Sequence, residues 1–177
     1  MESLINKVKF ILLNPKEIWH KYTYDYISVQ EAILTYVIPL SLIPAIALFL
    51  RKIIETGDII AAISIAVITV LSNVIGIWLS GFVIYKLAPS FNANSNMNDT
   101  VKLLAYSYTP VWVAGIFKLI DGLGIISLVA TIYTFYIYYK GLAPVTKVRK
   151  MNEPTFFATS ILVIIILNTL VDFILVI

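Results

Sequence analysis

The sequence contains no cysteine and one histidine, His20, and 13% of its residues are charged. Without cysteine the chain cannot form disulfide bonds, bind iron–sulfur clusters or zinc through thiolates, or use a thiol nucleophile. The motifs H-E-x-x-H and G-x-S-x-G and a phosphate-binding glycine loop do not occur. We therefore expect a protein that is not an enzyme, with no catalytic residues, no metal and no cofactor.

The chain also has little excess of charge of one sign, since it contains 13 Lys and Arg residues and 10 Asp and Glu residues and has a formal net charge of +3. This dispersed charge does not predict nucleic-acid binding. Apolar side chains, in contrast, make up 60% of the 177 residues, more than a soluble domain of this length would bury. The composition predicts an all-α integral membrane protein surrounded by the lipid bilayer.

Several apolar segments approach the roughly 20 residues that a helix needs to cross about 30 Å of hydrocarbon. Their ranges are 32–50, 59–85, 101–120, 123–140 and 155–177. Ser28 and Asp58 are the expected N-caps of the first two segments, and Gly57 is the expected end of the first. We predict a bundle of five transmembrane helices over residues 32–177, preceded by an amphipathic interfacial arm over residues 1–31.

The distribution of Lys and Arg predicts the orientation of these spans. If the N-terminus is cytoplasmic, only Arg51, Lys52 and Lys118 of the 13 basic residues lie outside. Cytoplasmic loops carry such an excess of positive residues. The expected topology therefore has a cytoplasmic N-terminus and an external C-terminus, and the isoleucine-rich composition indicates a prokaryotic cell membrane.

The arm has apolar residues at helical spacing from Leu4 to Leu12, and Pro15 interrupts the pattern. Such a helix can lie on the membrane surface, where each lysine gains about 1 kcal/mol from anionic lipids. The candidate surface contacts are Lys7, Lys9, Lys16, Trp19 and Lys21. Packing of the arm against the protein's own spans is the alternative, and the sequence does not decide between the two.

The stretch AYSYTPVW, residues 105–112, places polar and aromatic groups in the middle of the third expected span. Pro110 has no amide hydrogen to donate to the carbonyl of Tyr106, so that oxygen needs another donor in lipid. Ser107 or Thr109 could supply it locally, and other spans could supply it through an amide or a phenol. The candidate polar site in the bundle core comprises Asn73, Tyr106, Ser107, Thr109, Pro110 and Tyr133.

Two further patterns lie in the expected spans. Ser72, Gly76 and Ser80 repeat every four residues and predict a face for close helix packing, through which the chain could form a homo-oligomer. Asp172 in the last span is expected to pair with Lys118 or Arg51, which would lower the cost of a carboxylate near hydrocarbon. For this carboxylate we favour a structural ion pair over a proton site.

The order of four motifs resembles the Yip/Yif family of membrane proteins, named for their interaction with Rab GTPases, and its compact prokaryotic members in particular. The motifs are NPKEIW in the arm, the long second span with its glycines, AYSYTPVW, and IYYKGLAPVTKVRK before the last apolar segment. The resemblance implies an all-helical bundle of five spans with a cytoplasmic N-terminus. In eukaryotic members it implies roles in vesicle traffic, but we do not extend Rab binding to this chain, whose first expected span begins at residue 32.

Two functions follow as hypotheses. The first is a non-enzymatic scaffold or adaptor that organises other membrane proteins or lipids. The second is a small transporter or channel, in which helices interrupted by Pro39, Pro44 and Pro110 surround polar groups. We favour the scaffold because the sequence has neither an internal repeat nor an ionisable residue at the centre of a span.

Overall fold

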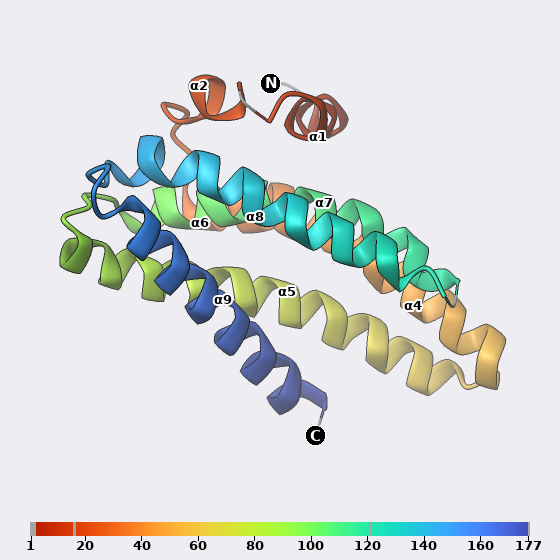
Figure 1. Cartoon of the computed structure of the whole chain (residues 1–177). Coiled ribbons are helices and arrows are strands. Elements are labelled where there is room, and N and C mark those ends of the chain that lie inside the picture. The colour runs from red at the N-terminus through yellow and green to blue at the C-terminus, as the bar shows by residue number, and fades with distance from the viewer. Residues whose placement is uncertain (1–2, 16, 121, 177) are drawn as a thin grey trace.

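The structure is a computed structural model that describes residues 3–15, 17–120 and 122–176. In these residues the regular structure is entirely helical, as expected for an all-α protein (Figure 1). Four helical stretches are long and apolar enough to cross a membrane: Val29–Thr56, Ile59–Phe91, Gly124–Thr146 and Glu153–Leu175. They correspond to four of the five expected spans.

The first two stretches are continuous helices with local changes of geometry. In the first, α3 (Val29–Ala32) runs through a π-helical turn (Ile33–Val37) into α4 (Ile38–Thr56), so the chain is widened just before Pro39. In the second, α5 (Ile59–Leu87) ends in a 3₁₀ turn (Ala88–Phe91). The predicted caps are confirmed, because Ser28 and Asp58 accept hydrogen bonds from backbone amides three residues ahead. Gly57, with φ of +68°, ends α4.

The third expected span, 101–120, is not one helix. It consists of α6 (Met97–Ser107), α7 (Thr109–Ala114) and a 3₁₀ turn (Gly115–Leu119). In Figure 1 this broken segment runs along α4 and α8 (Gly124–Thr146), and α6, α7 and the 3₁₀ turn pack on one or both of these helices. Most of α6 is buried by its neighbours, so this part of the segment lies inside the bundle, whereas Ile116, Phe117 and Lys118 of the 3₁₀ turn are exposed.

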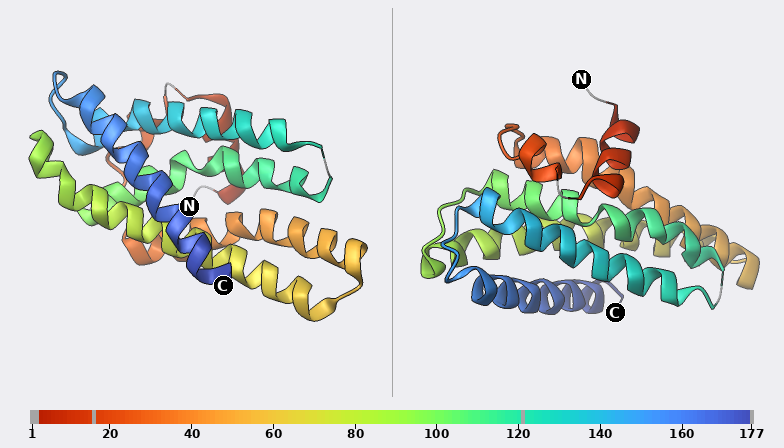
Figure 2. Two further views of the ribbon diagram at one scale, coloured as in Figure 1. Left: turned by 60° about the horizontal axis from the view of Figure 1, so that its bottom comes forward. Right: turned by 45° about the horizontal axis from the view of Figure 1, so that its top comes forward.

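The arm and the last helix lie on opposite flanks of the bundle (Figures 1 and 2). The arm comprises α1 (Leu4–Leu13) and α2 (Ile18–Tyr22), and α1 runs across the direction of the bundle helices. On the other flank α9 (Glu153–Val176) packs mainly on α5. The broken segment and α8 lie between these layers and carry much of the core.

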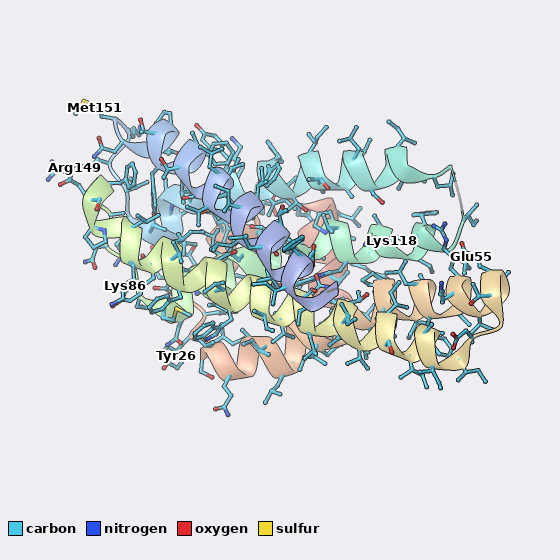
Figure 3. The ribbon with its side chains drawn as sticks, turned by 90° about the horizontal axis from the view of Figure 1, so that it is seen from below. Tyr26, Glu55, Lys86, Lys118, Arg149 and Met151 are labelled. Atoms are coloured by element: carbon cyan, nitrogen blue, oxygen red, sulfur yellow. The ribbon has the colours of Figure 1, made fainter. Side chains whose placement is uncertain are left out.

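Figure 3 shows which labelled residues lie toward each end of the bundle. Tyr26, Lys86, Arg149 and Met151 lie toward one end, and Glu55 lies at the other. Lys118 is set back from the Glu55 end, between helices. We call the first the basic end and the second the Glu55 end.

Candidate functional site

The helix break in AYSYTPVW is stabilised by a side chain within the motif. α6 ends at Ser107 and α7 begins at Thr109, with Pro110 in its first turn. The Thr109 hydroxyl donates a hydrogen bond of 2.7 Å to the carbonyl of Tyr106, the acceptor that Pro110 cannot serve. Ser107 bonds the carbonyl of Leu103 at 2.7 Å instead. Of the donors considered from the sequence, Thr109 fills the role.

Buried aromatic side chains surround this break. Tyr36 from the first span shares a 2.6 Å hydrogen bond with the Thr109 hydroxyl, and its ring lies 4.9 Å from that of Tyr106, centroid to centroid. The indole nitrogen of Trp112 donates a 2.7 Å hydrogen bond to the side-chain oxygen of Asn73 on α5. The motif therefore joins the first, second and third expected spans. We use the name aromatic junction for the residues that make these contacts: Tyr36, Asn73, Tyr106, Thr109 and Trp112.

The arm packs on the same junction. The ammonium group of Lys7 donates to the Tyr106 hydroxyl at 3.1 Å and lies 5.3 Å from the ring centroid of Tyr22. Tyr133, which the sequence grouped with the core site, instead donates to the carbonyl of Leu12 at 2.8 Å. Both bonds hold α1 against the bundle.

Trp19 anchors α2 in the same way. Its side chain is buried, and its indole nitrogen donates a 3.0 Å hydrogen bond to the carbonyl of Ile137. Gly141 allows this contact, because a Cβ atom at that position would overlap the Trp19 ring. Trp19 thus faces the protein and not the lipid, and the arm packs on the bundle.

The other expected surface lysines occupy varied positions. Lys9 is exposed, and the Lys21 ammonium lies 4.4 Å from the ring centroid of Phe10. Lys16 lies outside the described residues. Contact of Lys9 with lipid headgroups stays a prediction.

The residues of the expected packing face lie in two different environments: two of them meet α9, and the third lines a cavity. A Cβ atom at Gly76 would overlap the side chain of Asn168 on α9, and Ser80 accepts a 3.4 Å hydrogen bond from the same side chain. Gly76 and Ser80 are therefore covered by α9 of the same chain. Ser72, one turn away, lines a polar cavity.

This polar cavity has a volume of about 370 Å³ and lies between α4, α5, the broken segment and α9. Its polar lining residues are Thr69, Ser72, Asn73, Tyr108, Lys118, Asn168 and Asp172. It thus unites Asn73, Ser72, Lys118 and Asp172, which the sequence assigned to three separate sets. A second cavity of about 420 Å³ adjoins it, sharing Leu48 and Lys118 and including Arg51.

The expected ion pair of Asp172 is not formed in the described residues, although Lys118 lines the same cavity. Arg51 pairs instead with Glu55 on its own helix, with 2.5 Å between Nε and Oε1. Asp172 and Lys118 are both exposed, so the cavity reaches the surface of the protein.

Lys102, which is not among the candidate site residues chosen from the sequence, holds part of the backbone near the arm. Its side chain is 1% exposed, and its ammonium group donates to the carbonyls of Thr23 at 3.0 Å and Asp25 at 2.7 Å. Asp99 lies 3.4 Å from the same nitrogen. Lys102 therefore holds the loop that joins the arm to the first span. A lysine three residues after an aspartate, flanked by apolar residues, was the available signal.

The fold and the site define the class as a multi-pass integral membrane protein whose broken helix is joined to its neighbours by buried polar and aromatic contacts. The sequence model of the Yip1 domain family matches residues 9–171. The chain belongs to the Yip1 family, as the motif order indicated. No curated protein and no solved structure matches it.

Proposed function

We propose that this protein is a non-enzymatic scaffold or adaptor, with five membrane crossings and an arm at the cytoplasmic face, that organises other membrane proteins or lipids. The observation that carries the proposal is the loop between α2 and α3, residues 23–28. Lys102 holds its backbone, yet Tyr24 and Tyr26 are 91% and 83% exposed. A backbone fixed from within that presents two tyrosines outward is a suitable contact surface for a partner.

The interior contacts favour the same role. In the aromatic junction the polar groups bond one another across helices, which stabilises the bundle's shape. These bonds leave the tyrosine and threonine hydroxyls engaged in structure. A rigid bundle that presents an ordered surface is what an adaptor requires.

Recovery of partners from native membranes tests the proposal. Full-length protein carrying Tyr24→Ser and Tyr26→Ser should recover its membrane-protein partners at least about fivefold less efficiently, because aromatic side chains provide much of the binding energy of an interface. The measurement is quantitative mass spectrometry after cross-linking and affinity purification.

Met151→Ser is the matched control, since Met151 is 87% exposed in the loop between α8 and α9, toward the same end. It should recover the partners as the unmodified protein does. Identical partner sets from the double variant and the control would refute the tyrosine loop as the contact surface.

The orientation is the second testable part. We infer a cytoplasmic N-terminus because Lys86 and Arg149 lie toward the same end of the bundle, opposite Glu55. The chain has no cysteine, so single cysteines report without background. A cysteine at Lys147 should react with a membrane-impermeant maleimide only after the cells are opened, and one at Thr56 should react in intact cells. Labelling at Lys147 in intact cells, with labelling at Thr56 only after the cells are opened, would show that the topology is the reverse of the proposed one.

The number of crossings is tested by the same labelling. A cysteine at Ser95, before α6, should behave like Lys147, and one at Gly122, before α8, should behave like Thr56. Because α6, α7 and the 3₁₀ turn lie between these two positions, opposite accessibility means that the broken segment crosses the membrane. Equal accessibility of the two positions would mean that the broken segment does not cross the membrane and that the chain has four crossings.

A further inference from the structure

The polar cavity contains hydrogen-bonding groups that the protein itself does not satisfy. Among the described residues, the side-chain polar atoms of Ser72, Tyr108, Lys118 and Asp172 make no hydrogen bond, and Lys118 and Asp172 attract each other across the cavity without forming a close ion pair. Lys118 and Asp172 are exposed, so both charges can meet a ligand that enters the cavity from the surface. A cavity that gathers a cation, an anion and two hydroxyls is therefore expected to hold polar atoms that the protein does not supply.

The two amides of the cavity are, by contrast, fixed by the protein. Asn73 accepts from Trp112 and donates to the carbonyl of Thr69, both at 2.7 Å. Asn168 donates to the carbonyl of Ile164 at 2.7 Å. These bonds keep the cavity wall rigid while the hydroxyls and charges stay available, which is the arrangement of a preorganised binding site.

The charges decide the class of ligand. Lys118 and Asp172 line one cavity without contacting each other, so a simple anion would meet the carboxylate and a simple cation would meet the ammonium group. A zwitterion avoids both costs by placing one charged group on each. The apolar part of the lining, which includes Leu48, Ile65 and Ile68, suits a short hydrocarbon segment between the two charges.

We propose that this cavity binds a zwitterion that carries an ammonium and a phosphate group. The carboxylate of Asp172 accepts from the ammonium, and Lys118 with the hydroxyls of Ser72 and Tyr108 donates to the phosphate oxygens. This chemistry occurs in the ethanolamine phosphate headgroup of a phospholipid and in free phosphoethanolamine. The site is set back from the Glu55 end, away from the tyrosine loop, so its failure would leave the proposed adaptor role untouched.

The test uses purified, delipidated full-length protein in detergent. Native mass spectrometry measures binding of phosphatidylethanolamine and of phosphatidylglycerol, and isothermal titration calorimetry measures binding of phosphoethanolamine. We expect one of the two ethanolamine probes to bind, and Asp172→Asn and Lys118→Gln each to weaken it at least about tenfold, since each removes one charge-assisted contact. Phosphatidylethanolamine binding alone assigns the site to a lipid headgroup, and phosphoethanolamine binding assigns it to a free zwitterion.

Two control variants remove charges near the Glu55 end without touching the cavity. Asp58→Asn keeps the N-cap of α5, and Lys52→Gln lies in the last turns of α4. Both should bind the probe as the unmodified protein does. Phosphatidylglycerol bound as tightly as phosphatidylethanolamine, unchanged binding by Asp172→Asn, or no binding of either ethanolamine probe would overturn the proposal. Thermal unfolding of each variant separates lost binding from lost folding.

Discussion

Replacing Trp112 by alanine is expected to lower the free energy of unfolding by about 3–5 kcal/mol, the range for removal of a fully buried aromatic side chain. Trp112 is fully buried. Its ring lies 6.4 Å from that of Tyr36 and 5.9 Å from that of Tyr108, centroid to centroid. The substitution would empty the centre of the aromatic junction, where three expected spans meet.

The hydrogen bond adds a separable part of this effect. The indole nitrogen of Trp112 donates to Asn73, so Trp112→Phe removes the donor while keeping most of the ring volume. Polar bonds between membrane helices contribute about 0.6–1.7 kcal/mol. Trp112→Phe should therefore cost about 1 kcal/mol, which places packing ahead of hydrogen bonding as the stabilising effect.

Unfolding in mixed micelles with increasing dodecyl sulfate, followed by far-UV circular dichroism, measures both changes. Trp78→Ala is the matched control because the Trp78 side chain is 44% exposed on the same α5 helix that carries Asn73. It should cost less than about 1 kcal/mol, since an exposed side chain leaves no internal cavity. Equal destabilisation by Trp112→Ala and Trp78→Ala would refute the central role of the junction.

The parts of the fold that were predictable from the sequence depend on local chemistry. Apolar runs marked four spans to within six residues of their observed ends, and Asp58 after Gly57 marked a helix boundary. A cap and a left-handed glycine act within one turn, so their effect can be read from neighbouring residues. The Yip1 family was predictable because its motifs are spread in order along the chain.

The geometry of the third expected span could not be predicted from neighbouring residues alone. Its composition suggested a crossing helix, but breaks near Pro110 and Gly115 divide it into α6, α7 and a 3₁₀ turn. At Gly115 a Cβ atom would lie 2.6 Å from the Cβ of Pro44, so the geometry of this segment depends on the close approach of α4. Such an approach joins residues far apart in the sequence, and no periodicity within either segment encodes it.

The candidate site was predictable as a list of residues but not as a set of contacts. An amide or a phenol from another span was considered as a donor to the Tyr106 carbonyl, yet Tyr133 donates to Leu12 of the arm and Asn73 accepts from Trp112. Which face of a helix meets which neighbour depends on the packing of all the spans. The choice for the arm, between lipid and bundle, depended on the same packing.

The second large effect is expected at Lys102. Replacing this lysine by methionine keeps most of the buried side-chain volume but removes the donor of two hydrogen bonds, to the carbonyls of Thr23 and Asp25. A hydrogen bond from a charged group contributes about 1.5–3 kcal/mol, and a carbonyl left buried without a donor adds a penalty. We expect Lys102→Met to destabilise the loop that carries Tyr24 and Tyr26 by about 3 kcal/mol.

Limited proteolysis measures this local effect. Chymotrypsin cleaves after tyrosine, and a segment must open before it fits a protease, so the rate of cleavage at Tyr24 and Tyr26 follows the population of the open loop. A change of about 3 kcal/mol corresponds to about a hundredfold rise in that population. Lys86→Met is the control, because Lys86 is exposed and lies toward the same end of the bundle.

The Lys102 variant also connects the loop's stability to the proposed function. If an ordered loop is needed for partner binding, Lys102→Met should lower partner recovery even though both tyrosines are still present, because binding must then include the free-energy cost of ordering the loop. Lys86→Met should leave recovery unchanged. Faster cleavage with unchanged recovery would mean that partners bind elsewhere on the bundle, whereas unchanged cleavage would mean that the two hydrogen bonds do not hold the loop.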